Sequence, residues 1–192
     1  MLFSTFTVAA SCLATSVFAQ FPPPPAGTKY YYFKTAIEAG QAAFKDKYDD
    51  LYLYSYHTGA GQGDAALSSG TPFSGHKGWF NTTGGNLNWF QPTANNSFYF
   101  GFGLNQPWDY YSSWQPAQIN GGQSNTGDLK LDDNNKLVFS PPKSNFYGYI
   151  ACDGQHLVPQ LYWRTRVFPD SSLPANCAAV CLVAELAPDT PS

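Results

Sequence analysis

The sequence predicts an all-β protein with a single domain, and three observations support that prediction. Short apolar and aromatic runs alternate with clusters of Gly, Pro, Asn and Ser along most of the chain, which is the spacing of strands and turns. Aromatic residues make up 17% of the chain, and they favour the pleated surface of a sheet. Charged residues make up only 12%, about half the usual share, which excludes a coiled coil, a helical bundle and a charged disordered chain.

The predicted strands follow one another from Lys29 onward. Leu51–His57 shows the pattern best, because Leu, Ser and His alternate there with three tyrosines at the two-residue period of a strand. The other predicted strands are short apolar or aromatic runs bounded by turn residues: 30–37, 78–81, 87–91, 97–102, 115–120, 128–131, 136–139, 147–152, 160–165 and 177–186. About a dozen short antiparallel strands can build the three four-strand units of a β-trefoil. A β-trefoil-like barrel is therefore favoured over a β-sandwich, although no strict internal repeat is visible.

Two local features refine this prediction. Leu129–Phe139 is the clearest hairpin, because the turn Asp132-Asp133-Asn134-Asn135 tolerates left-handed backbone and can bond its own backbone. Residues 35–47 alone suggest a helix, and Gly40 in their middle limits it to one short turn or an irregular loop.

The N-terminus has the features of a secretory signal peptide over residues 1–19. It is uncharged and largely apolar, and the small residues Val17 and Ala19 precede a cleavage site that would leave Gln20 first. The alternative is a membrane anchor, for which the segment is too short and too rich in Ser and Thr. Residues 20–28 are a proline-rich tether, 29–187 form the domain, and 188–192 are a polar tail. We therefore expect an extracellular protein, with no membrane contact after cleavage.

Cleavage would leave three cysteines, Cys152, Cys177 and Cys181, which is an odd number. On a regular strand Cys177 and Cys181 share a face at a separation of about 13 Å, which is too far for them to bridge each other. Cys152 is therefore expected to be one partner of a single disulfide. Closing the loop to Cys177 would contribute roughly 3 kcal/mol. The remaining cysteine is expected to be a buried free thiol, with an intermolecular disulfide as the alternative.

Charge and motifs exclude several classes of function. The net charge of −3, without a basic block, argues against nucleic-acid binding. The cysteine spacing is not that of a zinc site, and no cofactor motif is present. A G-x-S-x-G elbow is absent, and the paired aspartates lie in predicted turns rather than in a two-carboxylate arrangement. His57 and Asp64 could pair, but a strand end and a loop explain them better. A hydrolase is therefore the least favoured function.

The candidate ligand-binding residues lie in one aromatic segment between Pro107 and Pro116: Trp108, Asp109, Tyr110, Tyr111 and Trp114. Aromatic rings beside an acid are typical of a sugar site, where ring faces meet C–H groups and polar side chains bond hydroxyls. The more common alternative is that Trp108 and Trp114 fill the ends of a β core. Asn81 and Asn95 begin N-glycosylation sequons, and Asn81 is the better acceptor because Thr occupies its third position.

Lys47–Gly61 (KYDDLYLYSYHTGAG), followed by Gly63-Asp64-Ala65, resembles a family of small secreted proteins of filamentous ascomycete fungi that has no assigned function. Further matching pieces are residues 78–81, 113–116, 152–154, 159–164, 173–177 and 183–185, so the resemblance covers nearly all of residues 29–187. It implies a fungal source, a glycan on Asn81 and a disulfide between Cys152 and Cys177. The chain departs from the family at Cys181, where a polar residue is usual, and at 154–157, which lacks paired tryptophans.

Residues 127–152 also resemble the later part of fungal phialide-type cell-wall proteins, some of them described as IgE-binding. That resemblance implies a trefoil-like barrel and a cell-wall setting. Together these patterns predict a secreted fungal protein without catalytic activity, with a cell-wall or host-interaction role. The alternative is a lectin-like, carbohydrate-binding module that uses the Trp108–Trp114 segment. The expected partners are cell-wall polysaccharide or a host surface molecule.

Overall fold

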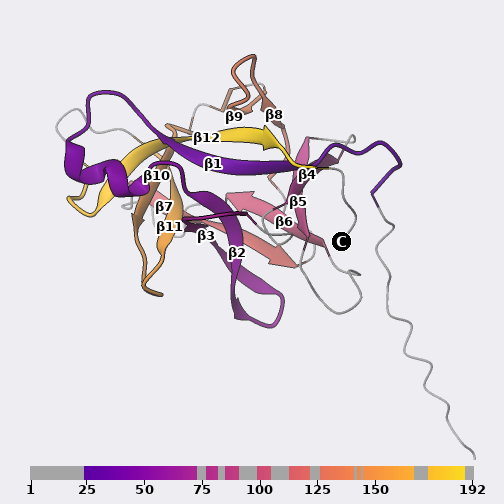
Figure 1. Ribbon diagram of the computed structural model, residues 1–192, viewed down its shortest axis with the longest axis horizontal. Helices are drawn as coiled ribbons and strands as arrows, with labels where there is room; N and C mark the ends of the chain where they lie inside the picture. Colours follow the sequence, from indigo (N-terminus) through magenta and orange to yellow (C-terminus); the bar gives the residue numbers. More distant parts are fainter. Residues whose placement is uncertain are drawn as a thin grey trace, which may run out of the picture.

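The structure, a computed structural model, describes residues 24–72, 77–81, 85–90, 99–104, 113–121, 126–140, 142–143, 145–166 and 173–188. These residues form twelve strands and one short 3-10 helix, η1 (Figure 1). The elements are β1 Tyr31–Ile37, η1 Ala43–Tyr48, β2 Tyr52–Gly59, β3 Gln62–Ser68, β4 Gly78–Asn81, β5 Asn86–Phe90, β6 Tyr99–Leu104, β7 Trp114–Gly121, β8 Leu129–Leu131, β9 Leu137–Phe139, β10 Tyr149–Asp153, β11 Pro159–Arg164 and β12 Cys177–Leu186. The predicted signal peptide lies outside the described residues.

Nine of the strands form a closed antiparallel barrel. The ring runs β1, β4, β5, β6, β7, β3, β11, β10 and β12, and it returns to β1. Its longest ladder joins β1 to β12, which lie side by side below the β8–β9 hairpin in Figure 1. The closure at β4 is narrow, because Tyr31 opposite Gly78 is the pairing there. The prediction of an all-β barrel is confirmed, and the strands do not separate into two sheets of a sandwich.

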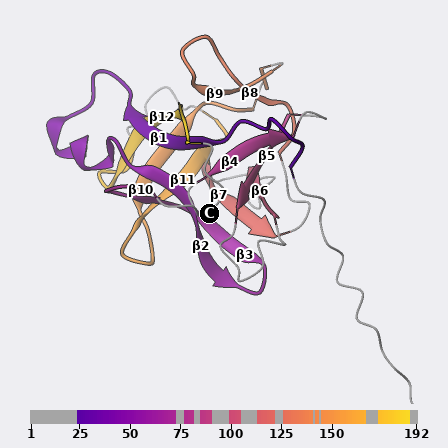
Figure 2. The same ribbon diagram turned by 45° about the vertical axis from the view of Figure 1, so that its right-hand side comes forward.

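The pairings also have the order of a β-trefoil. Three hairpins, β2–β3, β6–β7 and β10–β11, form the middle of three successive four-strand units. The remaining strands link in chain order, through the β1–β4, β4–β5, β8–β9 and β12–β1 pairings. Two further contacts complete that order: Leu129 N–H donates to the Gly85 carbonyl before β5, and Lys136 beside β9 bridges to Val183 of β12. In both Figure 1 and Figure 2 the β8–β9 and β2–β3 hairpins lie at opposite ends of the molecule.

Aromatic side chains fill much of the barrel interior. Trp89 contacts Phe33 at 5.4 Å and Phe102 at 5.9 Å between ring centroids, and all three side chains are fully buried. Leu53 and Leu161 close the interior from the hairpin side and are equally buried. Burying each such side chain contributes roughly 1.5–3 kcal/mol. A chain with few charges and many rings therefore has enough apolar surface for one core.

β3 is the one strand among the described residues that the sequence does not predict. The Gly and Ala residues of β3 have low strand propensity, so the sequence after His57 predicts only a turn there. Packing overrides this propensity, because a Cβ on Gly63 would lie 2.7 Å from the Ile119 carbonyl oxygen of β7. Only glycine therefore permits this approach of the two strands.

The predicted hairpin and the limited helix are both present. Asp132 Oδ1 accepts hydrogen bonds from the backbone N–H of Asn134 and Lys136, at 2.9 and 2.8 Å, and Asn135 is left-handed at φ 58°. These are the features expected of an Asp/Asn turn. The helical segment is confined to η1, while β1 continues to Ile37. The described end of the predicted tether is a turn, in which the Thr28 hydroxyl donates to the Pro25 carbonyl.

One disulfide joins Cys152 of β10 to Cys177 of β12, which are direct partners across the ladder. This is the pairing that the resemblance implies. Cys181 is free, as expected for the remaining cysteine, but it is partly exposed rather than buried, because it lies on the side of β12 that Val183 shares, opposite in direction to buried Leu182.

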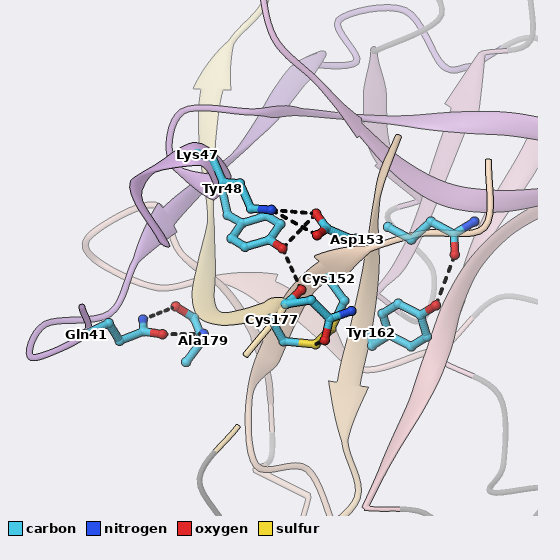
Figure 3. Close-up of a disulfide and its surroundings, with 10 residues drawn as sticks. Gln41, Lys47, Tyr48, Cys152, Asp153, Tyr162, Cys177 and Ala179 are labelled. Atoms are coloured by element: carbon cyan, nitrogen blue, oxygen red, sulfur yellow. Dashed lines mark hydrogen bonds and ion pairs between the residues drawn. A yellow bond between two sulfur atoms is a disulfide. The ribbon is translucent and has the colours of Figure 1, made fainter. Parts of the chain in front are cut away.

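Side chains from η1 hold this end of the barrel in place, as Figure 3 shows. Lys47 Nζ donates to both Asp153 oxygens at 2.9 Å, and the Tyr48 hydroxyl lies 2.8 Å from Asp153 Oδ1 and 2.5 Å from the Asn176 carbonyl oxygen. These hydrogen bonds, from Lys47 first and then Tyr48, lower the pKa of Asp153. Just before η1, Gln41 Nε2 donates to the Ala179 carbonyl oxygen, and Gln41 Oε1 accepts from the Ala179 N–H. The disulfide and these bonds together fix η1 against β10 and β12.

Replacing Cys152 and Cys177 together with Ala is expected to lower the free energy of unfolding by about 3 kcal/mol, because the unfolded chain regains the freedom of the loop. The two cysteines are 25 residues apart. Urea unfolding without reductant, followed by tryptophan fluorescence, measures the change. Cys181→Ala is the matched control and should change it by less than about 1 kcal/mol. Equal losses in the two proteins would contradict this account of the disulfide.

Candidate functional site

The three hairpins present a shared outer surface. On β7 the buried residues Gln115, Ala117 and Ile119 alternate with the more exposed residues between them, and β11 shows the same alternation after Gln160. Residues that pair directly across a ladder point to the same side of the sheet. Tyr56 pairs with Asp64, and Asp64 with Gln118; Tyr54 pairs with Ala66, and Ala66 with Gln160.

We call this surface the hairpin face and define it by six residues: Tyr54, Tyr56, Asp64, His156, Gln160 and Tyr162. Five of them come from β2, β3 and β11, and His156 comes from the turn between β10 and β11. The face therefore exists only because two hairpins from distant parts of the chain, β2–β3 and β10–β11, meet.

Asp64 lies at the centre of the hairpin face. Its Oδ2 accepts a hydrogen bond from Gln160 Nε2 at 2.9 Å and lies 3.4 Å from His156 Nε2. Gln160 Oε1 in turn accepts from the Tyr162 hydroxyl at 3.0 Å. The Asp64 side chain is 26% exposed, and its Oδ1 has no hydrogen-bond partner among the described residues. The carboxylate is thus oriented by its neighbours and still has an oxygen available to a ligand.

Aromatic rings flank this carboxylate. The Tyr56 and His156 rings stack at 4.6 Å with an angle of 16° between their planes, and Tyr54 meets Tyr56 edge-on at 6.5 Å. Burial raises the pKa of Tyr162, and the negative charge of Asp64 raises it further. Burial likewise raises the pKa of Tyr54. Both hydroxyls therefore stay protonated at neutral pH, and the Tyr162 hydroxyl, whose proton is donated to Gln160, keeps its oxygen as an acceptor.

A carboxylate, a primary amide, phenol hydroxyls and flat rings within one face can bind a molecule that combines several hydroxyls with C–H surface. The rings pack against C–H groups, and the polar atoms donate to and accept from hydroxyls. In a binding site lined by rings, a small number of well-placed polar groups fixes the orientation of the ligand. The arrangement is therefore suited to recognition of a polyhydroxyl ligand.

Comparison with known families identifies a match that covers most of the chain. A family model described as a domain of unknown function, DUF7907, matches residues 28–186. The chain belongs to the DUF7907 family. No curated protein and no solved structure matches the chain.

Of the sequence-predicted ligand residues in this DUF7907 domain, Trp114 is described. It begins β7 opposite Arg164, is 38% exposed, and follows Ser113, whose carbonyl accepts from Thr165 N–H at 2.9 Å. In the β7–β11 ladder Pro116 pairs with Tyr162, and Trp114 lies two residues before Pro116. Trp114 therefore lies on the same side of the sheet as Tyr162 and extends the hairpin face along β7. Trp108, Asp109, Tyr110 and Tyr111 lie outside the described residues, as does Asn95. Asn81 is described and is exposed at the end of β4.

The histidine that meets Asp64 is His156 and not His57. His57 is exposed and pairs with Gly63, whereas Asp64 pairs with Tyr56, so His57 and Asp64 point to opposite sides of the β2–β3 hairpin. The sequence does not identify His156, Gln160 and Tyr162 as site residues. The available signal was the run of three alternating tyrosines in Leu51–His57, which leaves one face of that strand aromatic and partly exposed.

The described residues show neither a metal cluster nor a membrane-spanning helix. They contain no group of three or more His, Cys, Asp or Glu side chains placed to hold a metal ion. No helix within the described ranges is long and apolar enough to cross a membrane.

Proposed function

We propose that this DUF7907 domain is a secreted, non-catalytic fungal protein that binds carbohydrate through the hairpin face, at the cell wall or at a host surface. The observation that carries the proposal is Asp64, a partly exposed carboxylate held by Gln160 and His156 between aromatic rings.

The first support is that the polar groups are already in place. Gln160 is 6% exposed, and it bonds both Asp64 and the Tyr162 hydroxyl, so these side chains have little freedom left to lose. Binding that orders few side chains keeps more of its contact energy as affinity.

The second support is the charge of the face. Asp64 is the one carboxylate among the six defining residues, and the set contains no Lys or Arg. An anionic ligand would be repelled by the Asp64 charge, whereas the hydroxyl groups of a neutral sugar can donate hydrogen bonds to the Asp64 carboxylate. The preferred ligands are therefore neutral oligosaccharides such as fragments of glucan, mannan or chitin. Trp114, further along β7, offers a second ring to a longer chain.

Binding is best tested by calorimetric titration with short chitin, glucan and mannan fragments. Asp64→Ala is expected to lower the affinity about tenfold or more, because the ligand loses a hydrogen bond to a charged group. Asp133→Ala is the matched control: it removes one negative charge from an exposed position in the β8–β9 turn and should leave the affinity unchanged.

Two results would refute the carbohydrate proposal. One is the absence of binding to every member of that panel at roughly 1 mM ligand. The other is an equal loss of affinity in Asp64→Ala and Asp133→Ala, which would show a general charge effect and no contact at the hairpin face.

The proposal of secretion rests on the uncharged N-terminal segment and on the Cys152–Cys177 disulfide, since structural disulfides persist in oxidising compartments. Protein collected from the medium of a fungal host should begin at Gln20. It should also lose mass on treatment with an N-glycosidase, and Asn81→Gln should reduce that loss. Retention of residues 1–19 in the exported chain, or of the whole protein inside the cell, would contradict secretion.

A further inference from the structure

The turn between β10 and β11 carries an exposed leucine in a backbone conformation that leucine rarely adopts. Leu157 is 100% exposed, and its φ of 60° lies in the left-handed region. Apart from glycines, the other described residues in that region are Asp50, Asp128 and Asn135, whose residue types tolerate it. Leu157 therefore departs from local preference twice, in its backbone and in its exposed apolar side chain.

The Leu157 side chain does not hold the turn together. The Gly154 N–H donates to the Val158 carbonyl oxygen at 3.2 Å, so backbone groups on either side of Leu157 close the turn. A glycine or an asparagine at this position would fit the left-handed backbone with less strain. A residue that breaks local preference without a benefit to the fold is typical of a functional position.

Leu157 lies next to the hairpin face. It follows His156 directly, and consecutive Cα atoms are about 3.8 Å apart. The His156 ring stacks on Tyr56 at 4.6 Å, and His156 Nε2 lies 3.4 Å from Asp64 Oδ2. A molecule that bonds Asp64 Oδ1 and extends past the His156 ring can therefore reach the Leu157 side chain.

A single exposed leucine is suited to a small apolar group on a ligand rather than to a large apolar surface. A stable protein interface buries about 800 Å² on each partner, and leucine is under-represented among the residues that dominate its affinity. A membrane-binding surface needs a continuous apolar face, whereas the preceding turn residues, Gln155 and His156, are polar. Among neutral sugars, those with an N-acetyl group offer a methyl group of suitable size together with an amide N–H.

We propose that the hairpin face, with Leu157 beside it, selects sugars that carry an N-acetyl group. This inference rests on the proposed carbohydrate-binding function and names the substrate class. The acetamido N–H would donate to Asp64 Oδ1, and the acetamido methyl group would pack against the Leu157 side chain. A sugar hydroxyl can replace the N–H as a donor but offers no apolar contact, so the methyl group decides the preference.

Chitotriose and cellotriose are the matched probes, because they share one backbone and differ at C2, where chitotriose has an acetamido group and cellotriose a hydroxyl. In calorimetric titration of the whole protein, chitotriose should bind about fivefold or more tightly than cellotriose. Leu157→Asn should lower the chitotriose affinity to about that of cellotriose and leave cellotriose binding unchanged. Asp64→Ala should instead weaken the binding of both sugars, because a hydroxyl and an N–H both donate to the carboxylate.

Stability measurements separate this role from a structural one. Asparagine tolerates the left-handed backbone, so Leu157→Asn should keep or raise the urea concentration at the unfolding midpoint while it weakens chitotriose binding. Leu157→Met keeps an apolar side chain and should retain the preference for chitotriose. Leu186→Asn is the matched control: Leu186 is 66% exposed at the end of β12, and its substitution should leave both affinities unchanged.

Equal affinity for the two trimers, or a preference for chitotriose that survives in Leu157→Asn, would overturn the inference and leave carbohydrate binding intact. An equal loss of affinity for both trimers in Leu157→Asn, or a lower unfolding midpoint in that variant, would also overturn it, since either result shows a structural role. If neither trimer binds but a mannan fragment does, the inference alone fails. If no sugar of the panel binds, the inference fails together with the proposed function.

Discussion

The mutual pairing of β3, β7 and β11 is the constraint on which the rest of the structure depends. Each hairpin contributes one strand to this triangle, through the pairs Asp64–Gln118, Gln160–Ala66 and Trp163–Gln115. Side chains tighten it: the Ser55 hydroxyl donates to the Ile119 carbonyl at 2.9 Å, and Gly63 N–H donates to Asn120 Oδ1 at 2.8 Å. The barrel closes because three hairpins are held together at one end.

The same triangle positions the hairpin face against the barrel interior. β11 lies between β10 on one edge and β3 and β7 on the other, so its alternating side chains contribute to two separate environments. Gln160 and Tyr162 orient Asp64 on the outside, while Leu161 and Trp163 face the interior. A polar, partly aromatic outer face and an apolar, inward side thus arise from one strand of six residues. This explains how a domain with few charged residues can have two chemically different sides on one strand.

Local patterns in the sequence were sufficient for much of the fold and for little of the site. Strand β4 and strand β12 have their predicted limits, and the Asp132–Asn135 turn forms as its residue types require. β3 was not predicted because Gly63 is required by its close contact with β7, and local strand propensity carries no information about that contact. The site escaped for the same reason: Asp64, His156 and Gln160 meet only through the β3–β11 pairing. Among the predicted ligand residues, Trp114 lies next to that surface, and its exposure follows from its place at the start of β7.

The most direct test of the account is an amide chemical-shift titration of the isotope-labelled domain with chitin, glucan and mannan fragments. We expect the tightest-binding fragment to shift the amides of β3, of β11 and of the turn that carries His156, and to leave those of the β8–β9 hairpin unchanged. The same titration of Asp64→Ala should show these shifts only at much higher ligand concentration. Shifts confined to β8–β9, or shifts in β3 and β11 that persist unaltered in Asp64→Ala, would contradict the claim that the paired hairpins form the binding surface.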